Sequence, residues 1–376
     1  MKKLPLWPAA FSCMLLAGCG NISDMSLRNI LADTVTNAKL HVYITGSCWS
    51  SSSQVPCYWK DGTLNILSMR SGDTYGMTGQ PVEDSSGDLY IAGRVGTTSS
   101  TVVPCYWKNG TLIPLPMGSG NTVGDTWTTP ALDSAGNLYI PGLVGASSAS
   151  FHVSMMPCYW KNGIQIPLSI VGDLYGEAYG IALDYSGDLY VSGITWGITN
   201  GTPCYWKNGT QTSLPTGGNP FGNAFGIALD SSGNLYFSGE TGQSWPFSTV
   251  PCYWKSGALT LLTMGSGNSY GYVNTPAQID SSGDLYITGQ VGPSSSTIVP
   301  CYWENGTLIF LPMGSGNSWG ETNGVALDSS DSYIAGVVGT SSSAALPCYW
   351  KNGLLNILPM GAGNTGGWGL GVMVGP

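Results

Sequence analysis

Pro203-Cys204-Tyr205-Trp206-Lys207-Asn208-Gly209 is one copy of a segment that the chain repeats with small changes. The tetrapeptide Pro-Cys-Tyr-Trp begins seven times, at Pro56, Pro104, Pro157, Pro203, Pro251, Pro300 and Pro347. Successive starts lie 46 to 53 residues apart. Self-similarity at this period indicates an array of equivalent structural units rather than a single-copy enzyme domain. Because the repeats cover nearly all of the 376 residues, they decide the architecture.

Each repeat contains four short strand candidates, which the best-preserved copy shows in order. Gly180–Asp184 is followed by the tight turn Tyr185–Gly187, and then by a second strand over Asp188–Gly193. After a longer loop comes the third strand, Pro203–Lys207, and Asn208-Gly209 is a strong hairpin signal that opens the fourth. Four antiparallel strands in about 48 residues are typical of one β-propeller blade.

The two ends of the chain predict how such a ring closes. The first repeat has strand candidates over 40–45, 55–60 and 63–69, but no first strand before them. The C-terminal segment Gly371–Val374 aligns with Gly180–Leu183 and supplies the missing strand. We therefore expect an all-β fold: a seven-bladed β-propeller of four-stranded antiparallel blades, in which the C-terminal strand completes the N-terminal blade. Closure of this kind leaves no sheet edge at the seam.

Composition limits the classes of function. The formal net charge of −9 repels phosphate backbones, so we expect no nucleic-acid partner. His41 and His152 are the only histidines of the chain, which leaves little material for histidine-based metal sites or nucleophile–histidine pairs. No motif indicates a metal or a cofactor.

The N-terminus has the features of an export signal. Lys2 and Lys3 precede an apolar run, and small residues lead into Cys19. Leu16-Ala17-Gly18-Cys19 resembles the lipobox of bacterial lipoproteins. The resemblance implies a signal peptide over 1–18, lipidation of Cys19, a tether over 19–39 before the propeller at 40–376, and anchoring in the bacterial cell envelope. Gly20, which follows the cysteine, suits the outer membrane or the cell surface. An ordinary secretory signal is the alternative.

A second resemblance concerns the first half of each repeat. The signature Gly-Ile-Ala-Leu-Asp-Ser-Ser-Gly-Asn-Leu-Tyr at Gly226–Tyr236 resembles NHL-type and related bacterial propeller repeats. The Pro-Cys-Tyr-Trp half is similar instead to extracellular bacterial repeat proteins. The NHL resemblance implies that the Gly-Ile-Ala-Leu-Asp strand lies innermost, beside the central channel. It implies no single activity.

Most of the conspicuous periodic residues are expected to be structural. The repeated cysteines and tryptophans should be buried between blades, and the Asp of each Asp-x-Ser segment should cap its own turn. Equivalent cysteines on neighbouring blades would lie about 10 Å apart, too far for disulfides. The extra Cys48 could pair with Cys57 in an oxidising compartment. The serine runs 50–53, 148–150 and 341–343 look like solvated spacers.

Functional residues are expected where the repeats differ. The loops between second and third strands, with the linkers between blades, should share one face, which we call the loop-rich face. The tight turns should lie on the opposite, tight-turn face. Aromatic and acidic residues that break the repeat gather on the loop-rich side, near the expected channel mouth. The candidate ligand-binding residues are Trp127, Glu177, Tyr179, Trp196, Phe225, Trp245, Glu321 and Trp368.

Three functions remain open. The first is a non-enzymatic, monomeric binding or scaffold lipoprotein whose loop-rich face engages a glycan, peptidoglycan or a protein partner. The second is a polysaccharide-active enzyme, in which Glu177 pairs with Glu321 or Asp125 as acid and nucleophile, provided that the carboxyls lie about 5 to 10 Å apart. The third is a purely structural surface protein.

Overall fold

The computed structural model describes residues 40–126, 128–146, 155–244, 248–273, 275–328 and 331–376. Within this part of the chain, the compact unit His41–Gly375 consists of strands with a single 3-10 turn, η1 (Ser342–Ala344). No helix among these residues is long and apolar enough to cross a membrane.

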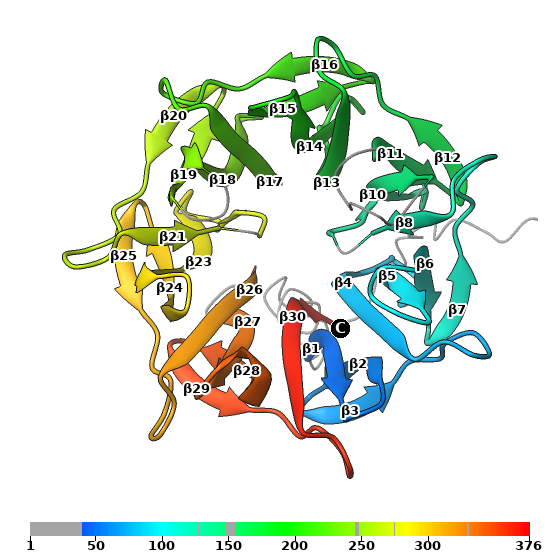
Figure 1. The fold of residues 1–376 in the computed structure, drawn as a ribbon, viewed down its shortest axis with the longest axis vertical. Helices are drawn as coiled ribbons and strands as arrows, with labels where there is room; N and C mark the ends of the chain where they lie inside the picture. Colours follow the sequence, from blue (N-terminus) through cyan, green and yellow to red (C-terminus); the bar gives the residue numbers. More distant parts are fainter. Residues whose placement is uncertain (1–39, 127, 147–154, 245–247, 274, 329–330) are drawn as a thin grey trace, which may run out of the picture. The chain divides into compact units, whose positions relative to one another are not determined.

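The pairings group the described strands into seven antiparallel blades, which Figure 1 shows arranged around a central opening. Each blade has four strands, except that the first strand of blades 3 and 6 is divided into two short segments. Blade 1 contains β30 (Gly366–Gly375), β1 (His41–Trp49), β2 (Gln54–Lys60) and β3 (Thr63–Ile66). Blade 2 contains β4 (Tyr75–Glu83), β5 (Leu89–Gly96), β6 (Val102–Lys108) and β7 (Thr111–Pro114). Blade 3 contains β8 (Val123–Asp125), β9 (Ala131–Leu132), β10 (Leu138–Gly145), β11 (Met156–Lys161) and β12 (Ile164–Pro167).

The other four blades continue the pattern. Blade 4 contains β13 (Tyr175–Leu183), β14 (Leu189–Trp196), β15 (Gly201–Lys207) and β16 (Thr210–Ser213). Blade 5 contains β17 (Phe221–Leu229), β18 (Leu235–Ser244), β19 (Ser248–Lys255) and β20 (Ala258–Leu261). Blade 6 contains β21 (Tyr270–Tyr272), β22 (Gln278–Ile279), β23 (Leu285–Ser294), β24 (Thr297–Glu304) and β25 (Thr307–Phe310). Blade 7 contains β26 (Trp319–Leu327), β27 (Ser332–Gly339), β28 (Ala345–Lys351) and β29 (Leu354–Ile357).

The ring closes as the sequence predicts. The C-terminal strand β30 pairs antiparallel with β1, from His41↔Gly375 to Trp49↔Gly366. In Figure 1 this red strand lies beside the blue β1 at the inner edge of blade 1. The first and last strands of the propeller therefore share one sheet, and we call this junction the seam.

The repeated tryptophan joins each blade to its neighbour. The seven indoles are 0 % exposed, and each donates its Nε1–H to a backbone carbonyl at the end of the preceding blade's outer strand, at 2.6 to 2.8 Å. Trp206, for example, bonds to the carbonyl oxygen of Ser169. Trp59 bonds to that of Pro359 across the seam. The expected inter-blade core, with each Trp N–H satisfied locally, is confirmed.

The tight turns are also confirmed. Asp184 accepts hydrogen bonds from the backbone N–H groups of Ser186 and Asp188, and the Tyr190 hydroxyl donates to the same carboxylate. Asp84, Asp133, Asp230 and Asp280 make the same backbone contacts. Asn208 adopts φ 50° in the third-to-fourth hairpin, the left-handed conformation that an Asn-Gly turn requires.

Candidate functional site

A pocket of about 470 Å³ opens over the seam, and we call it the seam pocket. Its walls come from three blades. Blade 1 supplies Trp368 of β30 and the β1–β2 loop, blade 2 the start of β4 and the β5–β6 loop, and blade 7 the η1 turn. The described lining residues are Trp49, Ser50, Ser52, Ser53, Gln54, Thr74, Tyr75, Thr97, Thr98, Ser342, Ser343 and Trp368.

The aromatic wall of the seam pocket is fixed by packing. The Trp49 and Trp368 rings meet edge to face, with centroids 5.3 Å apart and planes at 73°. Gly366 lies directly against the Trp49 indole, where a Cβ atom would overlap the ring. Both tryptophans are half-buried, so each combines a packed edge with an accessible one. An aromatic surface held in this way loses little conformational freedom when a ligand binds.

The polar wall consists of hydroxyl and amide side chains. The β1–β2 loop in this wall is held by hydrogen bonds among its own residues and the adjoining strands. Ser50 N–H donates to the Ser53 carbonyl at 2.9 Å, and the Gln54 amide donates to Ser47 Oγ at 2.9 Å. None of the described residues that line the seam pocket carries a charge. Hydroxyls can both donate and accept, so the pocket suits a ligand that is itself rich in hydroxyl groups.

Tyr75 connects the seam pocket to the channel mouth. Its hydroxyl donates to the sulfur of Met77 and accepts a hydrogen bond from Arg94 Nη2 at 3.3 Å. Arg94 in turn forms a buried ion pair with Asp125 of the next blade. Burial raises the pKa of Asp125 to about 6, and the guanidinium acts against that rise. The positive charge of Arg94 is therefore already paired with a neighbouring carboxylate.

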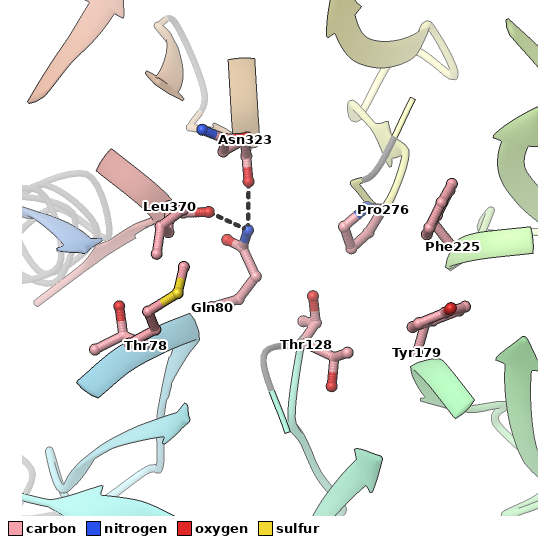
Figure 2. Close-up of a pocket in the computed structure, with 10 residues that line it drawn as sticks. Thr78, Gln80, Thr128, Tyr179, Phe225, Pro276, Asn323 and Leu370 are labelled. Atoms are coloured by element: carbon pink, nitrogen blue, oxygen red, sulfur yellow. Dashed lines mark hydrogen bonds between the residues drawn. The ribbon is translucent and has the colours of Figure 1, made fainter. Parts of the chain in front are cut away.

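The channel itself is narrow. A cavity of about 50 Å³ is bordered by Tyr179, Phe225, Pro276 and Leu370, among others, and Figure 2 shows these side chains arranged around it. Gln80 projects into this space and donates its amide to the carbonyls of Asn323 and Leu370, at 2.7 and 2.9 Å. A second cavity of about 240 Å³ shares Gln80 with the first. Gln80 therefore borders both cavities, together with Thr129 and Pro276.

The three candidate acidic residues lie in different environments. Glu177 is buried and accepts a hydrogen bond from the Tyr179 hydroxyl at 2.6 Å. Glu321, on β26, is half-buried, and burial raises its pKa to about 7. Asp125 is held by Arg94, as described above. A carboxyl whose pKa lies near neutral pH suits a general acid, and the pKa of Glu321 is raised further than that of Asp125.

The other candidates divide into three groups. Trp368 lines the seam pocket, and Tyr179 and Phe225 line the channel, where their rings lie 5.2 Å apart. Trp196 instead packs between Tyr175 and Phe221 as part of the contact between blades 4 and 5. Trp127, Trp245 and Cys19 lie outside the described residues, as do the tether and the serine run 148–150.

Sequence reasoning missed the polar wall of the seam pocket. Ser50–Ser53 and Ser341–Ser343 are partly or fully exposed, as expected of solvated spacers, but Ser50, Ser52, Ser53, Ser342 and Ser343 also line the pocket. The signal that could have found them is the predicted ring closure, because it brings the first loop of the chain beside the last one. Gln80 was also missed, although it stands where Gly180, Gly226 and Gly324 occur in other blades.

The described residues offer no group of three His, Cys, Asp or Glu side chains close enough to hold a metal ion. The seven repeat cysteines and Cys48 are free buried thiols. Neither face shows a ready-made metal centre in this part of the chain, so we derive the candidate chemistry from the pocket walls.

Comparisons with known proteins agree with the fold and go no further. No family model and no curated protein sequence matches the chain. A solved puromycin-hydrolysing peptidase of Mycobacterium tuberculosis is similar in structure over 84 % of this chain, with a TM-score of 0.52 and 10 % identity. The chain spans about half, 53 %, of that peptidase, and at this identity the likeness concerns the fold alone.

Two further solved structures are similar at lower TM-scores. A polysaccharide lyase described as an ulvan lyase aligns over 88 % of this chain and 85 % of its own, with a TM-score of 0.48 and 8 % identity. A gluconolactonase of Xanthomonas campestris aligns over 75 % of this chain and 92 % of its own, with a TM-score of 0.37 and 16 % identity. We draw nothing about activity from either. The chain is a β-propeller.

Proposed function

We propose that this protein is a non-enzymatic binding protein for a neutral oligosaccharide, held in the seam pocket and presented at the bacterial cell envelope. The observation that carries the proposal is the composition of the pocket wall, in which two tryptophans and a tyrosine face a set of hydroxyl and amide side chains. Its volume of about 470 Å³ falls within the usual range for small-ligand sites.

The aromatic, hydroxyl and amide side chains that line the seam pocket favour one class of ligand. The apolar face of a sugar ring stacks on an aromatic ring, while its hydroxyls exchange hydrogen bonds with serine, threonine and amide groups. An uncharged wall gives a charged ligand no counter-ion, so the removal of its charge from water would oppose binding. A neutral saccharide therefore fits better than a phosphorylated or strongly acidic one.

Binding is favoured over catalysis for the same pocket. Its described lining residues include no carboxylate, histidine or cysteine that could act as acid, base or nucleophile. Two of the three candidate carboxylates are already engaged, Asp125 by Arg94 and Glu177 by Tyr179.

A glycan-binding screen followed by calorimetry tests the proposal. We expect a neutral oligosaccharide to bind wild type, Trp368→Ala to weaken binding about tenfold or more, and Trp368→Phe to keep most of it. Tyr185→Ala is the matched control, since Tyr185 is 87 % exposed in a tight turn on the opposite face. Equal binding by wild type and Trp368→Ala, with both proteins folded, would move the ligand away from the seam pocket.

A second candidate function rests on Glu321. A polysaccharide-active enzyme needs a general acid, and burial raises the pKa of Glu321 to about 7, so that a large share of this carboxyl is protonated near neutral pH. Incubation with the oligosaccharides that bind, followed by mass spectrometry of the products, tests this function. Release of shorter sugars by wild type but not by Glu321→Gln would establish catalysis; unchanged sugars would leave binding alone.

Attachment to the envelope is part of the proposal and rests on the sequence Leu16–Cys19. We expect the protein, expressed in a Gram-negative host, to partition into detergent and to carry fatty acyl chains on Cys19. The Cys19→Ser variant should lose both properties. An unmodified Cys19 in intact mass spectrometry would instead indicate an ordinary secretory signal.

A further inference from the structure

Blade 1 holds a pair of thiols in direct contact. Cys48 Sγ of β1 lies 3.7 Å from Cys57 Sγ of β2, and both side chains are 0 % exposed. Cys57 is the cysteine of the repeat, whereas Cys48 is an addition. At the corresponding position the other blades have valine or threonine: Val95, Val144, Thr195, Thr241, Val291 and Val338. The second thiol is thus confined to the blade that closes the ring.

We propose that Cys48 and Cys57 are a modification site, at which a disulfide forms and locks the hairpin of the closing blade. The two residues are diagonal neighbours on paired strands, since Cys48 is opposite Val55 and Cys57 is opposite Gly46. Their side chains reach the same side of the sheet and already touch. A bond of about 2.05 Å requires the sulfurs to approach by under 2 Å, which side-chain rotation with a small strand adjustment can supply.

The reaction is a thiol–disulfide exchange with a protein or small-molecule disulfide as oxidant. The Cys48 thiolate attacks one sulfur of that disulfide, and the other sulfur leaves as a thiolate. Cys57, after losing its proton, then attacks Cys48 Sγ and displaces the second thiolate. Two protons and two electrons leave the cysteine pair, and the oxidant takes them up to become two thiols.

The environment distinguishes the two sulfurs. The hydrogen bond from Cys57 lowers the pKa of Cys48, whereas burial raises that of Cys57 well above its ordinary value. Cys48 is therefore the attacking thiolate. Because both sulfurs are buried, a bulky oxidant reaches them while the hairpin is open, either during folding or through local opening.

The disulfide would act on the seam pocket, and this consequence rests on the proposed function. Cys48 directly precedes Trp49, and the hairpin loop between β1 and β2 supplies part of the pocket wall. A bond at the base of this loop restricts its motion before the ligand arrives, which strengthens binding. Loss of the bond should weaken oligosaccharide binding several-fold without removing any contact residue.

The test is to refold the full chain with oxidised or with reduced glutathione, and to digest it after blocking free thiols. We expect a peptide pair joined through Cys48 and Cys57 only in the oxidised sample, with Cys105 and Cys158 still alkylated. The oxidised form should unfold at a temperature higher by roughly 3 to 8 °C, which a reducing agent abolishes. This chemical readout does not depend on any ligand.

Cys48→Val is the matched variant, because valine stands at this position in four other blades. It should fold, with the same circular dichroism in both buffers, and should lose the response of the melting temperature to oxidant. The proposal is overturned if Cys48 and Cys57 are fully alkylated after oxidative refolding, or if Cys57 is found bonded to a different cysteine. A disulfide without any glycan binding would remove the proposed function and leave this site standing.

Discussion

The contacts between blades and the loop-rich face both use tryptophan. Between blades the tryptophan recurs at the same position of every repeat, whereas on the loop-rich face its position differs from blade to blade. Between blades, the same tryptophan makes the same hydrogen bond seven times, with each indole fully buried. On the loop-rich face, Trp49 and Trp368 meet edge to face in the seam pocket, whereas Trp196 packs between Tyr175 and Phe221. Repetition therefore marks residues that hold the ring together, while residues that depart from it serve either a pocket or the packing of blades.

Removing one tryptophan from each region tests whether the two regions contribute differently to stability. Trp206→Ala should lower the free energy of unfolding by about 3–5 kcal/mol, because it leaves a cavity and removes the bond to Ser169. Trp368→Ala removes a half-buried ring, so its cost should be clearly smaller. Urea unfolding followed by tryptophan fluorescence measures both. Equal losses would mean that the loop-rich face is as structural as the blade contacts.

Gln80 tests whether a residue outside the repeat can also hold the ring. Its amide donates to the carbonyls of blades 7 and 1, and its oxygen accepts from the N–H of Val372. Gln80→Ala should cost about 1–3 kcal/mol in the same urea experiment, since three hydrogen bonds are lost in a confined channel. Gln80→Met keeps the length of the side chain without the amide. Wild-type stability in that variant would show that the channel is held by packing instead.

Glu321 should make the stability of the protein depend on pH, whereas the repeated tryptophan hydrogen bonds between blades involve no titratable side chain. Its pKa is about 7 in the folded protein and near 4.5 when unfolded, so the folded state binds the proton more tightly. The associated stability is fully present below pH 4.5 and is lost as the pH rises to 7. Between pH 5 and 7.5, wild type should therefore lose about 2 kcal/mol more than Glu321→Gln. Parallel pH profiles of the two proteins would contradict this expectation.

The sequence predicts the repeated part of the molecule because local rules produce it. The alternation of side chains along a strand places Cys204 and Trp206 on one side, and Asn208-Gly209 determines a hairpin. The missing first strand of the N-terminal repeat implies that the last strand of the chain closes the ring. The seam pocket depends on which loops meet in space, and serines carry little local signal for that. The sequence analysis grouped Trp368 with the longer loops, beside which the structure places it, but interpreted the neighbouring Ser50–Ser53 as spacers.

Blade 6 departs from the repeat at a contact between lysine, tyrosine and aspartate that other blades contain. In blade 4, Lys207 lies over the Tyr190 ring at 5.1 Å and bonds to Asp188 at 2.7 Å. Blade 6 has Glu304 at this position, in contact with Tyr286. Glu304→Lys should restore the arrangement found in the other blades and raise stability by about 0.5–1 kcal/mol.

The control for this substitution is Glu304→Gln, which removes the negative charge without adding a positive one. Glu304→Lys should exceed it at low ionic strength, and the difference should shrink in 1 M salt as the new ion pair is screened. Thermal unfolding at two salt concentrations measures both effects. If lysine gives no more stability than glutamine, the Lys–Tyr–Asp contact adds nothing at this position, and blade 6 is free to vary there. A salt-sensitive gain would show that blade 6 lacks stability at this position that the lysine of the other blades supplies.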